Sequence, residues 1–303
     1  LAADDSVQLG ANGSIDVAGR RLNLAGAVVD VAGGAVEGVG RNGGVNFLAG
    51  SRVDVSSGNG SAGAGSLGVL GGGVVSLAGD LVGTGPAAAS SGSFALTAGS
   101  LDGWTALNRE LNAGGFNSWR SIETLAGDLA VDAGETVQAE KVTLAASGGN
   151  LTVAGRIDAQ AAGGGTVLLA ARGDLTVANG AEIDARATAA GQGAGQVTVS
   201  SSDGNVSLQS GSRMRLDGYN GEAGGELLVR AGATADDLRI AELGASVEGA
   251  VRTILAPVLR SGPVEILDGV VTESLRSLLD AFMAGAPANI RSRLGLGPDT
   301  LIR

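Results

Sequence analysis

The 303-residue chain contains no cysteine and no histidine, and aromatic residues make up only 2% of it. Without histidine it lacks the commonest general base and the commonest metal ligand. Without cysteine it forms no disulfide, which suits a bacterial protein that crosses a membrane unfolded. Only one lysine, Lys141, is present. We therefore expect a protein that is not an enzyme, with no catalytic residues, no metal site and no cofactor.

The charge balance also restricts the partners. The chain has 20 basic and 31 acidic residues, so its net charge is −11. An acidic surface is repelled by phosphate backbones, and no basic run or aromatic platform offsets this repulsion. No apolar run reaches the length of a membrane-spanning helix. The composition thus predicts no nucleic-acid partner and no membrane span.

What the chain does contain is glycine and small apolar residues. There are 54 glycines, and hydrophobic residues, mostly Ala, Val and Leu, make up 44%. This hydrophobicity is too high, and the charge too low, for a disordered chain. A thin core of such side chains suits a narrow solenoid better than a compact globule.

Short apolar runs with period-two alternation recur along the chain and predict strands. In the first half they lie at 14–18, 44–49, 52–55, 74–78 and 94–98. In the second half they lie at 129–131, 142–146, 151–153, 157–159, 167–171, 175–177, 183–185, 197–199, 206–208 and 227–229.

These runs follow one another in a fixed order of three types. Residues 164–167, 173–177 and 182–185 form one triplet, and the next begins at Gly195. The loops between them are too short for a crossover helix, so each triplet predicts one three-strand coil stacked on the last. The sequence therefore predicts an all-β protein with the fold of a parallel β-helix. A sandwich or barrel, the competing fold, would need antiparallel hairpins and no ordered triplet.

Two segments depart from the repeat. Between the coils of 1–100 and those of 123–232, residues 101–122 predict a short helical insert on the coil. Trp104, Leu107 and Leu111 have helical spacing there, with Asp102 as a candidate cap and a glycine pair at 114–115 as the stop. The aromatic residues Trp104, Phe116 and Trp119 either pack on the coil, which we favour, or form an exposed interaction patch.

Residues 233–303 predict strands followed by a helical insertion at about 270–295. Gly285 should end a first helix, and Pro287 should open a second that stops at Gly295. The apolar face of the pair contains Leu275, Leu278, Leu279, Phe282, Met283, Ile290 and Leu294. We expect this pair to extrude from the coil and dock by that face; the alternative is that it caps the end of the coil.

Four aspartates in the strands, Asp16, Asp54, Asp158 and Asp184, each lie between two apolar residues and should point outward. Stacked carboxylates suggest either calcium binding or a glycan-cleaving pair. The interpretation we favour is a solvated face whose charge opposes edge pairing between chains. The arginines that could neutralise the column are Arg20, Arg52, Arg156 and Arg213.

Several elements resemble one family. They are the Leu-Asn-Ala-Gly-Gly-Phe run at 111–116, the Gly-Asp-Leu element at 127–131, the repeated Leu-Thr-Val-Ala and Ile-Asp-Ala strands, and the segments 281–284 and 290–296. Together they resemble the filamentous-haemagglutinin-type large exoproteins of Gram-negative bacteria. The resemblance covers most of the chain and is to the repetitive interior, which carries no transferable site residues.

The resemblance implies a two-partner secretion substrate. Such a protein passes through an outer-membrane barrel transporter and folds outside as a right-handed parallel β-helix with three strands per coil. The implied location is the secreted fraction or the cell surface, and the implied role is a stalk for adhesion, biofilm or cell contact. A host-cell or glycan receptor is then the expected partner.

Two alternatives remain open. An autotransporter passenger uses the same coil but carries its own C-terminal barrel. A β-helical enzyme acting on polysaccharides would need a cleft of long loops with clustered Asp, Lys and Arg, whereas the loops here are short and rich in Gly and Ala.

Far-UV circular dichroism tests the predicted fold. We expect strand-dominated spectra for residues 1–232 and for the full chain, with extra helical signal only when 233–303 are present. A strongly helical spectrum for 1–232 would contradict the β-helix, and the stalk hypothesis with it.

Overall fold

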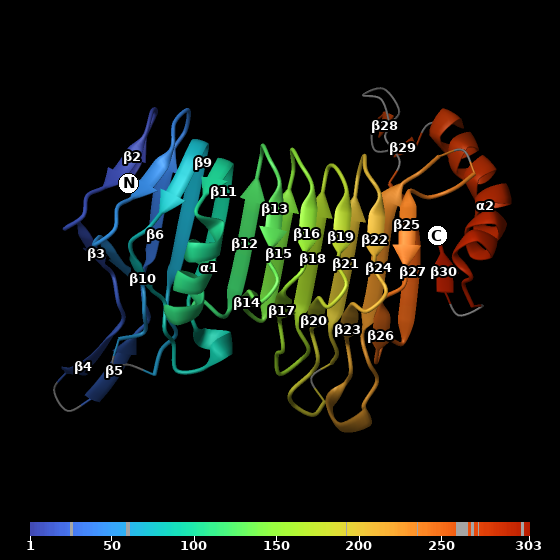
Figure 1. Cartoon of the computed structure of the whole chain (residues 1–303). Coiled ribbons are helices and arrows are strands. Elements are labelled where there is room, and N and C mark those ends of the chain that lie inside the picture. Colours follow the sequence, from blue (N-terminus) through green and yellow to red (C-terminus); the bar gives the residue numbers. More distant parts are fainter. Residues whose placement is uncertain are drawn as a thin grey trace.

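The protein is an elongated stack of strands with its termini at opposite ends (Figure 1). The computed structural model describes residues 1–24, 27–58, 61–191, 193–234, 236–258, 266–267, 270–271, 273–297 and 300–303. Within these ranges it has two α-helices, and nearly all strand pairs are parallel. The all-β class predicted from the sequence is confirmed.

One long sheet extends over the whole length of the stack. Its strands, in spatial order, are β1 (Ala2–Ala3), β6 (Ala35–Gly40), β9 (Ser66–Leu77), β11 (Ser93–Asp102), β12 (Trp119–Thr124), β15 (Lys141–Ala146), β18 (Thr166–Ala171), β21 (Gln196–Ser201), β24 (Glu226–Gly232), β27 (Arg252–Val258) and β30 (Thr300–Ile302). Two more strands, β2 (Val7–Leu9) and β7 (Val45–Phe47), join through the second half of β9.

Three shorter parallel sheets complete the stack. The second sheet contains β13 (Leu129–Val131), β16 (Leu151–Val153), β19 (Leu175–Val177), β22 (Val206–Leu208) and β25 (Ile240–Leu243). The third contains β14 (Thr136–Gln138), β17 (Arg156–Asp158), β20 (Glu182–Asp184), β23 (Arg213–Arg215) and β26 (Ser246–Glu248). The N-terminal sheet contains β3 (Ser14–Asp16), β8 (Arg52–Asp54) and β10 (Asp80–Val82).

From β12 to β27 the chain visits the long, second and third sheets in turn, and each visit adds one strand. The register places like residues above one another: Leu151 beside Leu175, and Ile157 beside Ile183. Alternate residues point inward, so Leu175 is buried while Thr176 lies outside. The buried side chains form one continuous core along the stack.

A polar ladder follows the corner between the long and second sheets. Asp128, Asn150, Asp174 and Asn205 occupy it, all of them exposed. Asp128 Oδ1 accepts from the Asn150 amide (2.7 Å), and Asp174 Oδ1 accepts from the Asn205 amide (2.7 Å). Asn150 Oδ1 in turn accepts from the Asp174 amide (2.8 Å). Because carboxylates alternate with carboxamides, no two negative charges are stacked directly at a spacing of about 4.8 Å.

The predicted insert at 101–122 is shorter than expected. The helix α1 (Trp104–Ala113) begins after Gly103, which has a φ of 70°, and has no side-chain cap, because Asp102 belongs to β11. It ends at the predicted glycine pair, where Gly115 has a φ of 76°. Residues 119–122 are not part of the insert, since they begin β12.

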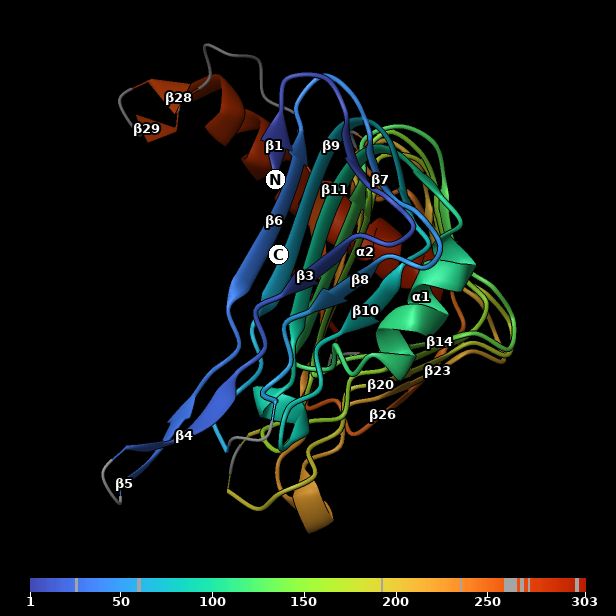
Figure 2. The ribbon, with the colours of Figure 1, turned by 90° about the vertical axis from the view of Figure 1, so that its left-hand side faces the viewer.

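Helix α1 stands where a strand would otherwise lie between β10 and β14 (Figure 2). Its side chains bind both neighbours. Glu110 Oε1 accepts from the Leu81 amide of β10 (3.1 Å). Asn108 and Asn112 both donate through Nδ2 to the Thr136 carbonyl of β14 (2.8 and 2.7 Å). These groups replace the missing backbone ladder on each side, which keeps exposed strand edges paired.

An antiparallel hairpin within residues 1–100 was not predicted. Strands β4 (Arg20–Leu24) and β5 (Ala27–Val31) pair with each other and project away from the stack (Figure 2). One face of the hairpin contains Leu22, Leu24, Val29 and Val31, which are all exposed. The predicted coils of 1–100 are therefore interrupted here.

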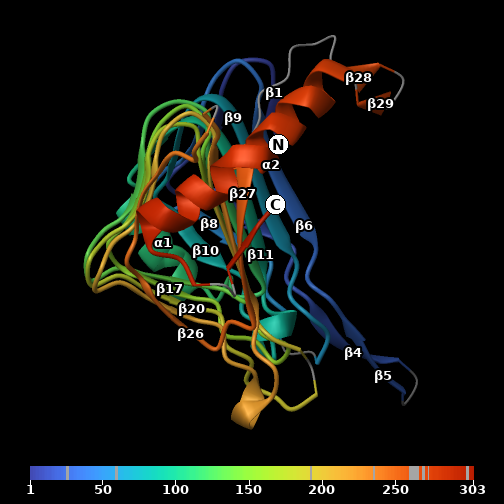
Figure 3. The same cartoon turned by 90° about the vertical axis from the view of Figure 1, so that its right-hand side faces the viewer.

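The C-terminal helical region is one helix rather than two. Helix α2 (Glu273–Leu294) continues through Gly285 and Pro287, and ends before Gly295, which has a φ of 61°. It lies across the end of the stack (Figure 3). Phe282, Ala286 and Ile290 form a buried stripe, and this packing holds the helix together across Pro287.

Other predictions for this region have mixed outcomes. Met283, predicted to dock, is 44% exposed. The side chains of Leu275, Leu278 and Leu279 lie outside the described part of the structure. Two short strands, β28 (Ile266–Leu267) and β29 (Val270–Val271), form an antiparallel pair before the helix.

The stacked core makes a quantitative prediction. Leu175→Ala removes a fully buried side chain in the middle of the second sheet, so it should lower the free energy of unfolding by about 2–5 kcal/mol. Thr176→Ala, on the outer face of the same strand, should change it by less than about 1 kcal/mol. Urea unfolding followed by circular dichroism measures both. Equal effects would contradict the assigned inward and outward faces.

Candidate functional site

The connections that lead from the third strand of each repeat back to the long sheet gather along one edge, here called the return corner (Figure 1). They differ greatly in length. Residues 83–92, with the short helix η1 (Ala88–Ser90), and residues 216–225, with η2 (Tyr219–Gly221), are long. The connection between β14 and β15 consists only of Ala139 and Glu140. The return corner is therefore the most varied surface of the stack.

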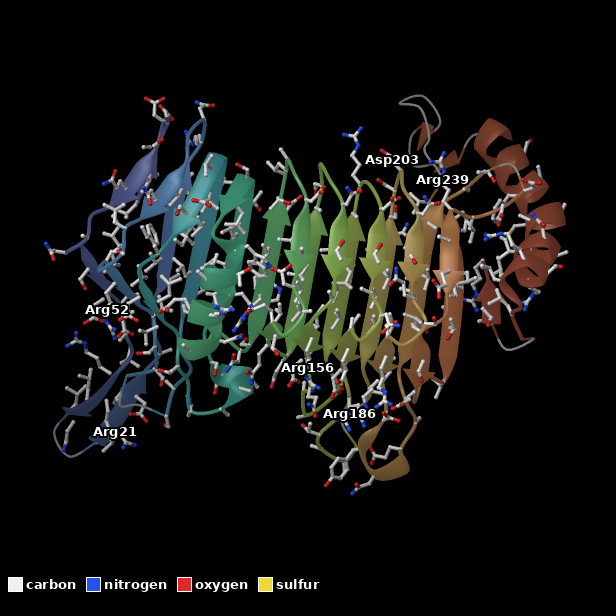
Figure 4. The ribbon with its side chains drawn as sticks, viewed as in Figure 1. Arg21, Arg52, Arg156, Arg186, Asp203 and Arg239 are labelled. Carbon is white, nitrogen blue, oxygen red and sulfur yellow. The ribbon has the colours of Figure 1, made fainter. Side chains whose placement is uncertain are left out.

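A network of ion pairs covers the third sheet beside this corner. Arg156 contacts Asp158 (3.4 Å), Glu182 (2.9 Å) and Asp184 (3.0 Å) across two strands. Arg186 adds a second contact to Asp184 (2.8 Å). Both arginines lie near one another toward the return corner (Figure 4). The network ties neighbouring strands together by charge as well as by backbone hydrogen bonds.

Asp184 departs from the predicted solvated column, because its side chain has no exposed surface. Burial raises the pKa of this carboxyl, but the hydrogen bonds and charge of Arg186, with the charge of Arg156, outweigh that effect and hold the pKa below its usual value. Asp184 is thus an ionised carboxylate with a structural role, and Arg156 and Arg186 cover and neutralise it. Sequence reasoning missed its burial, although an Arg two residues on, at Arg186, was a visible signal.

The other three aspartates agree better with the predicted outer face, on which arginines neutralise the carboxylates. Asp158 binds Arg156, and Asp54 binds Arg52 (2.9 Å). Asp16 lies 3.8 Å from Arg20 and is exposed. Arg213 does not neutralise one of these aspartates, because it contacts Glu248 of the next strand instead (3.3 Å). In the part of the chain that the structure describes, no group of three or more acidic side chains is placed to hold a metal ion.

The three aromatic residues do not form one exposed patch. Phe116 is buried, with its ring edge-on to Phe94 at a centroid distance of 6.0 Å. Trp104 packs against the core and donates through Nε1 to the Ala130 carbonyl (2.8 Å). Trp119 alone remains accessible, at 41% exposure on the outer face of β12. The patch hypothesis is therefore wrong for Phe116, whereas Trp104 is half-buried.

Sequence reasoning also missed Arg120, which occupies an inward position between Phe94 and Val142 and is fully buried. Its guanidinium donates to the Phe116 carbonyl (2.7 Å) and to Asn112 Oδ1 (2.7 Å). Burial lowers the pKa of Arg120 to about 9, so the group stays charged at neutral pH. Arg120 thus fastens α1 to the long sheet from within.

A hollow opens at the short connection of the return corner, and we call it the notch. Its lining residues are Ala88, Asn117, Gln138, Ala139, Glu140, Asp158 and Gln160. Its volume is about 210 Å³. Partial burial raises the pKa of the Glu140 carboxyl, and the Lys141 charge partly offsets this. Except for Ala88 and Ala139, every lining side chain is a hydrogen-bonding amide or carboxylate.

Comparison with known proteins gives no relatives: no protein-family model, no curated protein and no solved structure matches the chain. Among the described residues, no helix is both long and apolar enough to cross a membrane.

Asp184→Asn tests the ion-pair network. At pH 7 the variant should lose about 1–3 kcal/mol of unfolding free energy, because Arg156 and Arg186 lose a buried charged acceptor. A carboxyl with a depressed pKa stabilises the fold above its unfolded pKa, about 3.9, and this contribution disappears as the pH falls through the folded pKa. The gap between wild type and variant should therefore close below about pH 4.

Asp16→Asn, at an exposed aspartate, is the matched control and should change stability by less than about 1 kcal/mol. Urea titrations between pH 3 and pH 7 give the comparison. An Asp184→Asn protein as stable as wild type at pH 7 would rule out a stabilising role for the network.

Proposed function

We propose that the chain is a segment of right-handed parallel β-helix that serves as the stalk of a secreted bacterial surface exoprotein. The observation that carries this proposal is the repeated visit to three parallel sheets in the same order, with like residues in register. A parallel crossover between strands of one sheet is right-handed in nearly all proteins, which supports the proposed hand.

The dimensions suit a spacer. The described part of the long sheet has eleven strands along its main path. At about 4.8 Å per strand they span about 50 Å. Each strand binds only its neighbours above and below, so a longer chain of the same kind would extend the rod without changing its width. Such a rod holds whatever it carries away from the surface to which it is attached.

The same local organisation supports export in an unfolded state. Each repeat packs mainly on the repeats next to it, so folding can proceed one repeat at a time as the chain emerges from a transporter. The absence of cysteine removes disulfides that would obstruct passage. We propose that the protein is a filamentous-haemagglutinin-type two-partner secretion substrate and that an outer-membrane transporter is its partner during export.

An adhesive role follows from the return corner. The connections, which differ in length, place solvent-facing residues along one edge of an otherwise regular rod. We propose that this edge mediates adhesion to other cells or within a biofilm. The core side chains maintain the rod, and the corner residues make the contacts.

Antibodies raised against the 303-residue chain test the location and the route of export. In the producing bacterium they should label intact cells, and deletion of the gene for the proposed outer-membrane transporter should abolish the label while the chain accumulates in the periplasm. A cytoplasmic protein serves as the control for cell integrity. Label that appears only after permeabilisation would refute the surface assignment, and label that survives the deletion would favour an autotransporter.

A further inference from the structure

We propose that the notch, together with Trp119, is a binding site for a neutral oligosaccharide. This inference deepens the adhesive part of the proposed function and does not depend on the route of export. Three observations support it: the hollow at the shortest connection of the return corner, the hydrogen-bonding groups that line it, and the exposed indole of Trp119, two residues beyond the lining residue Asn117.

The hollow arises from unequal connections. β14 leads into β15 through Ala139 and Glu140 alone, whereas the next connection, 159–165, is longer. On the other side, Ala88 of the 83–92 connection forms part of the wall. The backbone around the short connection is held from both sides, because the Glu140 amide donates to the Asn117 carbonyl (2.8 Å) and the Glu140 carbonyl accepts from Thr166 (3.0 Å). The site is therefore preformed by the stack.

The lining is suited to hydroxyl groups. Gln138 offers both a donor and an acceptor on one planar amide, and Glu140 and Asp158 offer acceptors. Asn117 offers mainly its amide N–H groups, because its Oδ1 accepts from Arg120, and Gln160 offers mainly its carbonyl, because its Nε2 donates to Asp158. A sugar hydroxyl is likewise both donor and acceptor, so it can satisfy such groups in pairs. Asp158 is held in place by Gln160 Nε2 (3.1 Å) and by Arg156. The polar groups are thus positioned before a ligand arrives.

Trp119 supplies the apolar platform. It lies two residues beyond Asn117 and beside Lys141, which directly follows Glu140. Strands of one sheet are about 4.8 Å apart, so the indole lies close to the rim of the notch. Arg120 points inward, and Trp119 therefore points out from the sheet. An exposed indole offers a flat apolar surface to the C–H face of a sugar ring, with a polar edge for its hydroxyls.

The charges select the ligand class. Two carboxylates line the notch, and the cations nearest to them, Arg156 and Lys141, are adjacent to Asp158 and Glu140 respectively. No uncompensated positive charge lines the hollow to hold a sulfate or carboxylate of an acidic glycan. We therefore assign a neutral sugar, such as a hexose or an N-acetylhexosamine chain.

Isothermal titration calorimetry of the full 303-residue chain against three defined probes tests the assignment: maltotriose, triacetylchitotriose and a heparin-derived tetrasaccharide. We expect at least one neutral trisaccharide to bind with a millimolar or tighter Kd, and the sulfated probe to bind more weakly. Trp119→Ala should weaken binding by about tenfold or more, and Gln138→Ala by a few fold.

Leu168→Ala is the matched control, because Leu168 is a half-exposed residue on the outer face of the same sheet, in β18. It should bind as wild type does. The assignment is overturned if neither neutral probe binds at 10 mM, or if Trp119→Ala binds as tightly as wild type. It is also overturned if the sulfated probe binds best, or if the protein cleaves a probe and so releases new reducing ends. Circular dichroism of the same samples separates the two proposals: an unchanged strand spectrum with no binding refutes the glycan site and leaves the rod intact.

Discussion

The backbone hydrogen bonds between successive strands set the rise of the whole stack. Because every strand must lie one ladder spacing above the last, the side chains of neighbouring repeats are brought into direct vertical contact. Leu stacks beside Leu and Val beside Val in the second sheet, and Ile beside Ile in the third. The same constraint governs the polar positions, where Asp and Asn alternate along one corner so that each carboxylate meets amide donors. The packing of the core, the polar ladder at the corner and the ion pairs between strands all depend on this one distance between strands.

Helix α1 shows what happens where the ladder is absent. A helix cannot present a row of backbone donors and acceptors to a strand, since its own hydrogen bonds use them. Glu110, Asn108 and Asn112 supply the missing partners from side chains, and Arg120 holds the helix from inside the core. A buried arginine without a carboxylate is costly, so four acceptors, one of them a main-chain carbonyl, surround it. Helix α1 therefore connects the regular strands on either side of it through specific side-chain hydrogen bonds.

The regular stack also explains where function can reside. Inward positions are committed to packing, and outward positions on the sheets contribute mainly to ladders of like or complementary residues. Only the connections can change length without disturbing the spacing, and those of the return corner do so most. The notch exists because one connection is short between longer neighbours. A stack of this type can thus change the shape of its return corner by changes in loop length alone.

The sequence by itself determined the strands within residues 142–229, their order in threes and most of their inward residues, because a period of two and a repeating triplet are local properties of the chain. It did not reveal β4, β5, β10 or β14. It located both helical regions and the glycines at their C-terminal ends, 114–115 and Gly295, but it wrongly placed a further helix end at Gly285. Only the tertiary structure decided that Arg120 and Asp184 are buried, that β4 and β5 leave the stack as a hairpin, and that Trp119 stays exposed while Phe116 does not. Whether a polar or aromatic residue is covered depends on which distant segment packs over it. No local pattern records that choice, and the notch is its clearest consequence, because its lining residues come from β14, from β17 and from four connections that lie far apart in sequence.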